Sequence, residues 1–145
     1  VQAIPAADEE DNRFLALQDK KILVVDEDEA IRSEAHDLLE PAGCVIETAH
    51  SGEAAITMVD AISGGYDVSI SAIHLSDMDG YELMKTLEKI VKPVPLVLMT
   101  GFGWDAGHVV VRARKDGLKH VVYKPFKVPQ IFDVLIDMVT PHDKA

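Results

Sequence analysis

The sequence predicts a single α/β domain in which a five-stranded parallel sheet carries helices on both faces. Two observations lead to this prediction. Short apolar, β-branched runs recur along the chain, and between them lie segments whose apolar residues are spaced as on one face of a helix. Strands and helices that alternate in this way favour parallel pairing, because each helix returns the chain to the same end of the sheet. The length of 145 residues suits one domain.

The first two strand–helix pairs are the most regular. Residues 21–25 and 44–49 are apolar runs of strand length. The helix expected at 29–40 has apolar residues at i, i+4, i+7 and i+8, and Pro41 ends it. The helix expected at 53–62 follows Ser51, which is suited to cap its first turn, and ends before Gly64.

Three further pairs complete the domain. Strands are expected at 67–72, 95–99 and 119–123, and helices at 81–91, 105–116 and 128–139. Asp79 is placed to cap the first of these helices. Ser69 and Ser71 make the third strand less apolar than a central strand usually is. The helix at 105–116 fits least well because Val109–Val111 are β-branched, although Gly117 is well placed as its C′ residue.

The expected domain occupies residues 21–140, with an N-terminal extension or linker at 1–20 and a short tail at 141–145. The extension contains an acidic cluster at 8–11, followed by Phe14 and Leu15. It is either a short helix arriving from an upstream domain or a frayed tail.

Composition excludes several classes of function. No apolar run approaches the ~20 residues of a membrane span, so this segment is expected to make no membrane contact. The net charge of −11 argues against nucleic acid as a partner, because such binding relies on Lys and Arg. Cys44 is the only cysteine, and its apolar surroundings predict a buried structural thiol. A cytoplasmic location fits these features.

Polar residues follow the expected strands at the edge where parallel sheets bind ligands. The first strand ends in the acidic residues 26–28, the fourth at Thr100 and the fifth at Lys124, while the third ends at Ala72 with His74 just beyond. Carboxylates suit Mg²⁺, and a hydroxyl and a lysine suit phosphate oxygens. Together these groups indicate phosphoryl transfer to a carboxylate.

Residues 20–140 resemble the response-regulator receiver domains of two-component phosphorelays. Four segments carry the resemblance, at Ile22–Asp28, Ile73–Gly80, Met99–Gly101 and Tyr123–Phe126. It implies a flavodoxin-like fold and a role in signal transduction, with a histidine kinase, a phosphotransfer protein or covalently linked kinase domains as partners. The last of these would make the chain part of a hybrid histidine kinase.

The resemblance also implies roles for individual residues. Asp26 and Glu27 match the acidic pair that helps to hold Mg²⁺, and the backbone carbonyl of His74 matches a third metal ligand. Thr100 and Lys124 match the residues that contact the phosphoryl group. In addition, Pro125 matches a proline whose preceding peptide bond is usually cis in this family, which implies a cis Lys124–Pro125 bond.

The sequence departs from the family where the phosphate-accepting aspartate should stand, because that position is Ala72. Alanine has no nucleophilic oxygen, so no aspartyl phosphate is expected, and Mg²⁺ binding should be weak or absent. The chain is therefore interpreted as a non-enzymatic pseudo-receiver or as a receiver inactivated by an introduced alanine. Val121, where the family often has an aromatic residue, and Ser76, where it often has proline, also depart from the family. Ser69, Ser71 and Val121, all off-pattern, favour a natural variant.

An alternative is a small phosphatase of the haloacid-dehalogenase type, in which two aspartates such as Asp26 and Asp28 act as nucleophile and general acid. The residues that follow, Glu29 and Ala30, do not match that family, and no late Asp-Asp motif or cap segment is present. A second alternative is a phosphate-independent interaction module.

Such a module could form a homodimer through region 105–139. This region contains Arg112, Arg114 and Lys115 in an otherwise acidic chain. The basic residues either mark a docking face or offset neighbouring acids such as Asp116 along a helix.

Overall fold

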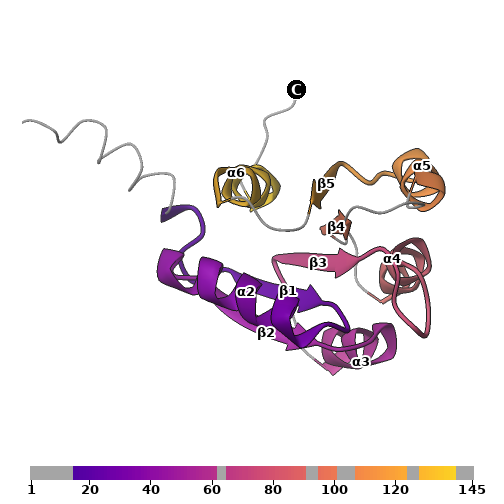
Figure 1. The fold of residues 1–145 in the computed structure, drawn as a ribbon, viewed down its shortest axis with the longest axis horizontal. Coiled ribbons are helices and arrows are strands. Elements are labelled where there is room, and N and C mark those ends of the chain that lie inside the picture. The colour runs from indigo at the N-terminus through magenta and orange to yellow at the C-terminus, as the bar shows by residue number, and fades with distance from the viewer. Residues whose placement is uncertain (1–14, 62–64, 91–94, 101–106, 124–127, 140–145) are drawn as a thin grey trace, which may run out of the picture.

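The structure is a computed structural model that describes residues 15–61, 65–90, 95–100, 107–123 and 128–139. Figure 1 shows strands and helices alternating along the chain. The strands are β1 Lys21–Val25, β2 Val45–Ala49, β3 Val68–Ala72, β4 Leu96–Thr100 and β5 His120–Tyr123. The helices are α2 Glu29–Leu39, α3 Gly52–Ala61, α4 Gly80–Glu88, α5 Gly107–Lys115 and α6 Val128–Val139, and a 3-10 turn at Glu40–Ala42 follows α2. Every expected element is present.

The five strands form one sheet in the order β2-β1-β3-β4-β5, and all neighbouring strands are parallel. Helices α2 and α6 cover one face, and α3, α4 and α5 cover the other (Figure 1). This strand order is that of the flavodoxin-like doubly wound fold, which confirms the expected fold class. The switch in strand order lies between β1 and β3, so the loops that follow these two strands border the crevice where such folds bind ligands.

The central strands are buried on both faces. Every residue of β3 is buried, including Ser69 and Ser71, so this strand is central although its sequence is less apolar than usual. The Ser71 hydroxyl donates to the carbonyl oxygen of Ala72 at 2.9 Å, which satisfies its polar group inside the core. Throughout the described residues, every buried side-chain nitrogen or oxygen has a hydrogen-bond partner.

Local chemistry sets where the helices begin and end. Asp79 accepts from the Glu82 amide at 2.8 Å, and the Glu82 carboxylate accepts from the Asp79 amide at 3.0 Å, so a complete capping box starts α4. That helix ends at Glu88, earlier than expected. Helix α5 forms despite its β-branched residues because Val109 and Ala113 are buried in the smaller of two hydrophobic clusters, the second hydrophobic cluster, together with Ile73, Met84 and Leu98.

The packed part of the chain begins before the first strand, because Leu17 is fully buried in the main hydrophobic cluster. Residues 1–14 of the expected extension and the expected tail lie outside the described residues. Within the described part, none of the helices combines the length and apolar character needed to cross a membrane.

Candidate functional site

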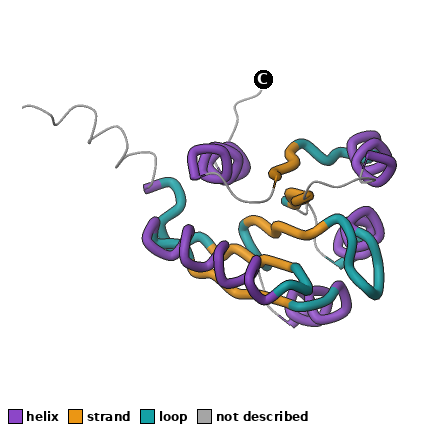
Figure 2. The backbone as a smooth tube through the Cα atoms, viewed as in Figure 1, coloured by secondary structure: helices purple, strands orange, loops and turns teal. Residues whose placement is uncertain are grey.

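The carboxyl ends of the strands bring Asp26 and Thr100 to one edge of the sheet, next to the loops that Figure 2 shows after β1 and β3. Val25 pairs with Ser71, Ala72 with Met99, and Thr100 with Tyr123. Asp26 follows Val25 directly, so Asp26, Ala72 and Thr100 stand at the ends of three neighbouring strands. The structure therefore places these three residues at one edge of the sheet.

Hydrogen bonds between side chains and backbone groups fix the turn between β1 and α2. Asp26 is buried, and its Oδ1 accepts from the amide of Asp28 at 2.9 Å. Asp28 caps α2 by accepting from the Ala30 amide at 2.9 Å. Arg32 reaches back along the helix, and its Nη1 donates to the carbonyl oxygens of Asp26 at 2.8 Å and Glu27 at 3.2 Å. A positive charge thus lies directly beside this acidic turn.

The Glu27 side chain is exposed and points toward the loop after β3, where its carboxylate accepts from the backbone amide of Ser76. Hydrogen bonds from Ser76, first from its side chain and then from its amide, hold the pKa of Glu27 below its usual range. Glu27 is therefore an ionised acceptor that joins the loop after β1 to the loop after β3.

A second carboxylate from the β3–α4 loop holds the same region to α3. The Asp77 side chain accepts from the amides of Gly52 at 3.1 Å and Glu53 at 2.9 Å, so it caps α3 from a distant part of the sequence. The Glu53 amide is the main reason why the pKa of Asp77 is lowered. Met78 packs so tightly here that a Cβ added at Gly52 would lie 2.5 Å from its sulfur.

Ala72 places a buried methyl group at the end of β3. The loop returns close to this point, since a Cβ added at Gly80 would lie 3.3 Å from the Ala72 carbonyl oxygen and 2.6 Å from Leu98. A methyl group can neither attack phosphorus nor ligate a metal ion. The described residues also contain no group of three or more His, Cys, Asp or Glu side chains placed to hold a metal ion. The donor set is therefore poorer than a hard divalent cation prefers.

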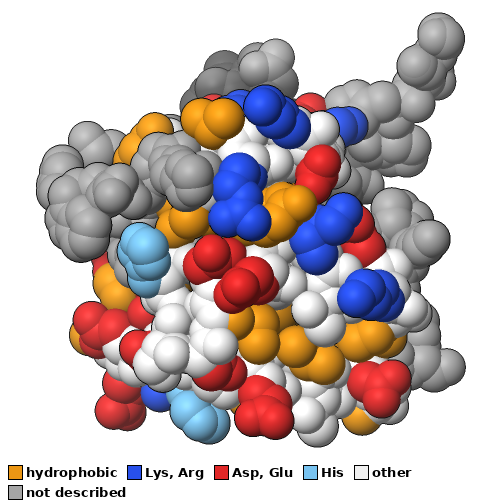
Figure 3. Space-filling model, turned by 90° about the vertical axis from the view of Figure 1, so that its right-hand side faces the viewer, with side chains coloured by type: hydrophobic (Ala, Val, Ile, Leu, Met, Phe, Trp, Pro, Cys, Tyr) orange, Lys and Arg blue, Asp and Glu red, His pale blue; other side chains and the backbone are white. Residues whose placement is uncertain are grey.

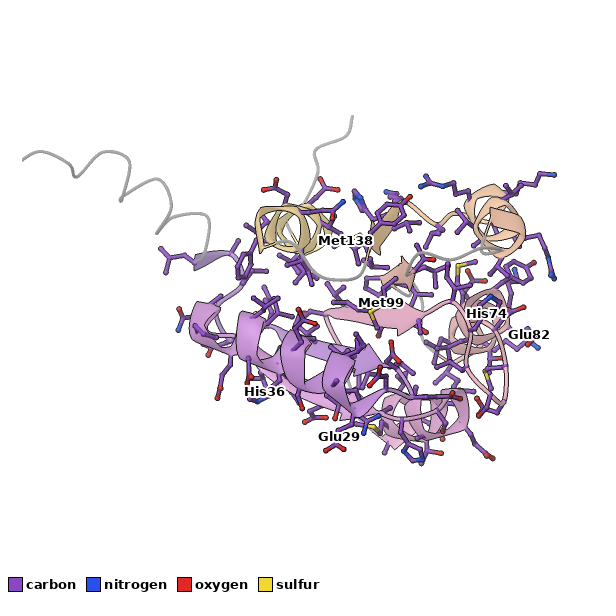
Figure 4. All side chains as sticks on the ribbon, viewed as in Figure 1. Glu29, His36, His74, Glu82, Met99 and Met138 are labelled. Atoms are coloured by element: carbon purple, nitrogen blue, oxygen red, sulfur yellow. The ribbon has the colours of Figure 1, made fainter. Side chains whose placement is uncertain are left out.

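The other predicted residues have mixed outcomes. Lys124 and Pro125 lie outside the described residues, so their contacts and the isomer of their peptide bond are not described. His74 is exposed, and it lies far from His36, which is on the outer side of α2 (Figure 4). Val121 packs against the second hydrophobic cluster, as expected of a core residue.

Sequence reasoning missed the contribution of Arg32 to this edge and the contact of Asp77 with α3. Arg32 lies one turn beyond the start of α2, so its helical position could have suggested that its side chain reaches the preceding loop. The contact of Asp77 with α3 joins residues 24 and 25 positions apart, and no local sequence pattern indicates it.

Comparisons with known proteins agree on the type of domain. Residues 22–136 match the family model of the response regulator receiver domain. The chain is 32% identical to the transcriptional regulatory protein FixJ of Bradyrhizobium diazoefficiens over 107 residues, which cover 73% of this chain and 50% of that protein. It is 25% identical to the sensor kinase CckA of Brucella abortus over 122 residues, which cover 84% of this chain and 13% of that protein.

Solved structures show the same architecture. A response regulator receiver domain protein from Clostridium thermocellum superimposes with a TM-score of 0.76 at 22% identity, covering 83% of this chain and 94% of that one. Full-length FixJ from B. japonicum gives a TM-score of 0.74 at 26% identity, covering 84% and 58%. The chain thus spans most of a solved receiver domain but half or less of the two curated relatives.

Proposed function

This chain belongs to the family of response regulator receiver domains, and we propose that it serves two-component signalling as a pseudo-receiver that does not accept phosphate. The observation that carries this proposal is Ala72, which occupies the buried end of β3 between the ends of β1 and β4. The resemblance puts the phosphate-accepting aspartate at this position. Asp26, Glu27 and Thr100 remain at the neighbouring strand ends, so the missing carboxylate is the specific defect.

Magnesium is proposed to bind weakly or not at all. Its remaining protein ligands would be Asp26, Glu27 and the backbone carbonyl of His74. Two of these are already engaged, because Asp26 accepts from the Asp28 amide and Glu27 from the Ser76 amide. An ion that depends on several oxygen ligands would have to compete with these hydrogen bonds without a carboxylate from position 72.

The proposed signal passes through protein contacts in the cytoplasm and not through phosphate turnover, so the domain is not expected to act as an enzyme. Candidate partners are a histidine kinase, a phosphotransfer protein or kinase domains linked to this chain. The likeness to a protein named as a sensor kinase supports the last of these. Region 105–139 remains the candidate homodimer face.

The proposal is tested by incubating the domain with Mg²⁺ and a small acyl phosphate and measuring the intact mass. The native chain should gain no phosphoryl group, whereas Ala72→Asp should gain one because the new carboxylate would stand at the strand end beside that of Thr100, where the family resemblance implies contact of Thr100 and Lys124 with the phosphoryl group. Ala72→Asn is the matched control, since it has nearly the same shape as aspartate but lacks the nucleophilic oxygen.

Two outcomes would contradict the proposal. An aspartyl phosphate in the native chain would show that another residue accepts phosphate. A folded Ala72→Asp variant that stays unmodified would show that Ala72 is not the specific defect.

A further inference from the structure

We propose that the outer face of α4 and α5 is a docking surface for a carboxylate-rich protein segment. We call this surface the basic platform and define it by Tyr81, Lys85, Val111, Arg112 and Lys115. The proposal goes beyond the function proposed above, because it depends on none of the residues at the carboxyl ends of the strands and would hold whether or not position 72 accepts phosphate. It assigns to a partner segment the α5 residues that a homodimer through region 105–139 would otherwise cover.

Charge is distributed unevenly over the molecule. The chain has a net charge of −11, yet Lys and Arg gather on α4, α5 and the residues that follow them. Figure 3 looks onto this side of the domain and shows Lys and Arg side chains mainly in its upper part, with acidic side chains among and below them. Elsewhere in the described residues the only Lys and Arg side chains are Lys20, Lys21 and Arg32, and the last of these is held against the β1–α2 turn.

Contacts between the two helices hold the basic platform in place. The Arg112 guanidinium carbon lies 4.4 Å from the centroid of the Tyr81 ring, which is cation–π geometry. The Tyr81 hydroxyl donates to Asp116 Oδ2 at 2.6 Å. Lys85 Nζ lies 3.5 Å from the same oxygen and 3.3 Å from Glu88 Oε1. The Arg112 and Tyr81 side chains are thus already ordered, which lowers the entropy cost of docking.

Ionisation supports the same arrangement. The hydrogen bond from Tyr81 holds the pKa of Asp116 below its usual range, and the same bond raises the pKa of Tyr81. Asp116 is therefore an anion and Tyr81 a neutral donor at neutral pH, so the link between α4 and α5 persists under physiological conditions.

The platform also offers apolar contact. Val111 is 55% exposed, and Lys115 lies one helical turn further along the same outer side, also exposed. Ala113 is on the opposite side of the helix and is fully buried, which fixes the direction in which the outer side faces. Arg and Tyr beside an exposed aliphatic residue are the residue types that dominate binding energy at protein interfaces.

Charge complementarity defines the occupant as a protein segment with several carboxylates next to an apolar residue. Carboxylates pair with Arg112 in a bidentate manner and with Lys115 as a point charge, while the apolar residue covers Val111. Nucleic acid fits less well, because its long phosphate backbone would extend from the platform onto the acidic remainder of the domain.

The proposal is tested with a short synthetic peptide of Glu, Asp and Leu that carries a fluorescent label, and a matched peptide with Gln and Asn at the acidic positions. Fluorescence anisotropy with the full chain should show binding of the acidic peptide that weakens as salt is raised, and at least about tenfold weaker binding of the amide peptide. Lys115→Glu should weaken binding of the acidic peptide about tenfold, and Arg112→Lys should weaken it less because the charge remains.

Lys20→Glu is the control, because it makes the same charge change at the far side of the domain and should leave binding nearly unchanged. Circular dichroism checks that each variant is folded, and Lys115→Ala replaces any glutamate variant that is not. The proposal is overturned by the absence of peptide binding at low salt or by equal effects of the Lys20 and Lys115 variants. Tighter binding of single-stranded DNA than of the acidic peptide, or self-association that Lys115→Glu abolishes, would also overturn it, because the platform would then hold a different occupant.

Discussion

Single residues differ in how far the sequence alone defines them. Ala72 stands at the end of β3, and hydrophobic patterning already predicts that this strand ends there. The hydrogen bond between Glu27 and Ser76 could not be predicted, because it joins residues 49 positions apart and depends on how two loops approach each other. The cation–π contact of Arg112 with Tyr81 is unpredictable for the same reason, since it requires the packing distance between α4 and α5.

Cys44 was predicted to be a buried thiol, and the structure confirms this. Burial raises its pKa to about 11, because the thiolate is poorly solvated there. Thiolate is therefore scarce at neutral pH, and we expect alkylation of the native protein to be slow there. As long as the pH stays below that pKa, each increase of one pH unit should raise the alkylation rate about tenfold, because it raises the thiolate fraction by that factor. Mass spectrometry of iodoacetamide-treated protein across a pH series measures this rate. The urea-unfolded chain is the reference, and equal rates for the two states at neutral pH would contradict the expectation.

At the scale of elements, most helix and strand boundaries follow from local residues. The capping box at Asp79 and the glycine at 117, with its φ of 112°, mark helix ends that the sequence predicts. The exceptions are elements whose formation depends on tertiary contacts. Helix α5 contains three consecutive valines and still forms, because the burial of Val109 outweighs its weak helix propensity.

Helix α3 depends on a cap supplied by another element, which leads to a stability prediction. Asp77→Ala removes the acceptor for the Gly52 and Glu53 amides and should lower the free energy of unfolding by about 1 kcal/mol at neutral pH. Because the pKa of Asp77 is lowered in the folded state, the difference from the native chain should persist above the ordinary carboxyl pKa and vanish as pH falls through the lowered value.

Urea unfolding followed by circular dichroism at neutral and acidic pH measures the effect of Asp77→Ala. Asp60→Ala is the matched control, since Asp60 is exposed near the other end of α3, where a carboxylate gives no capping. Equal losses of stability in the two variants would show that Asp77 does not cap the helix.

At the scale of the whole molecule, the fold was predictable because the local and long-range patterns of the sequence all indicate the same α/β architecture. Apolar runs set the strands, helical periodicity sets the helices, and the alternation of the two requires a parallel sheet. The sequence pattern does not set which strands are neighbours, since the order β2-β1-β3-β4-β5 depends on the direction in which each helix crosses the sheet. The resemblance to receiver domains supplied that order through the flavodoxin-like fold.

The missing carboxylate should also change how the whole domain responds to Mg²⁺. Asp26 is buried, and extending the β1–β3 register by one residue sets it opposite Ala72, which is buried too. Ala72→Asp would therefore add a second buried carboxylate beside the first, and repulsion and desolvation should lower the melting temperature in the presence of a chelator. Mg²⁺ should bind the folded variant and reverse this loss. At a concentration a hundredfold above its Kd, the ion would add about 2.7 kcal/mol to the free energy of unfolding.

The native chain should show nearly the same melting temperature with and without Mg²⁺, because we expect it to bind the ion weakly or not at all. Ala72→Asn separates charge from shape: it should lower the melting temperature through the buried amide, and Mg²⁺ should not restore it. Differential scanning calorimetry with chelator and with millimolar Mg²⁺ provides the comparison for all three chains. If Mg²⁺ raised the melting temperature of the native chain as much as that of Ala72→Asp, the remaining acidic residues would suffice to hold the ion, and its predicted weak binding would be wrong.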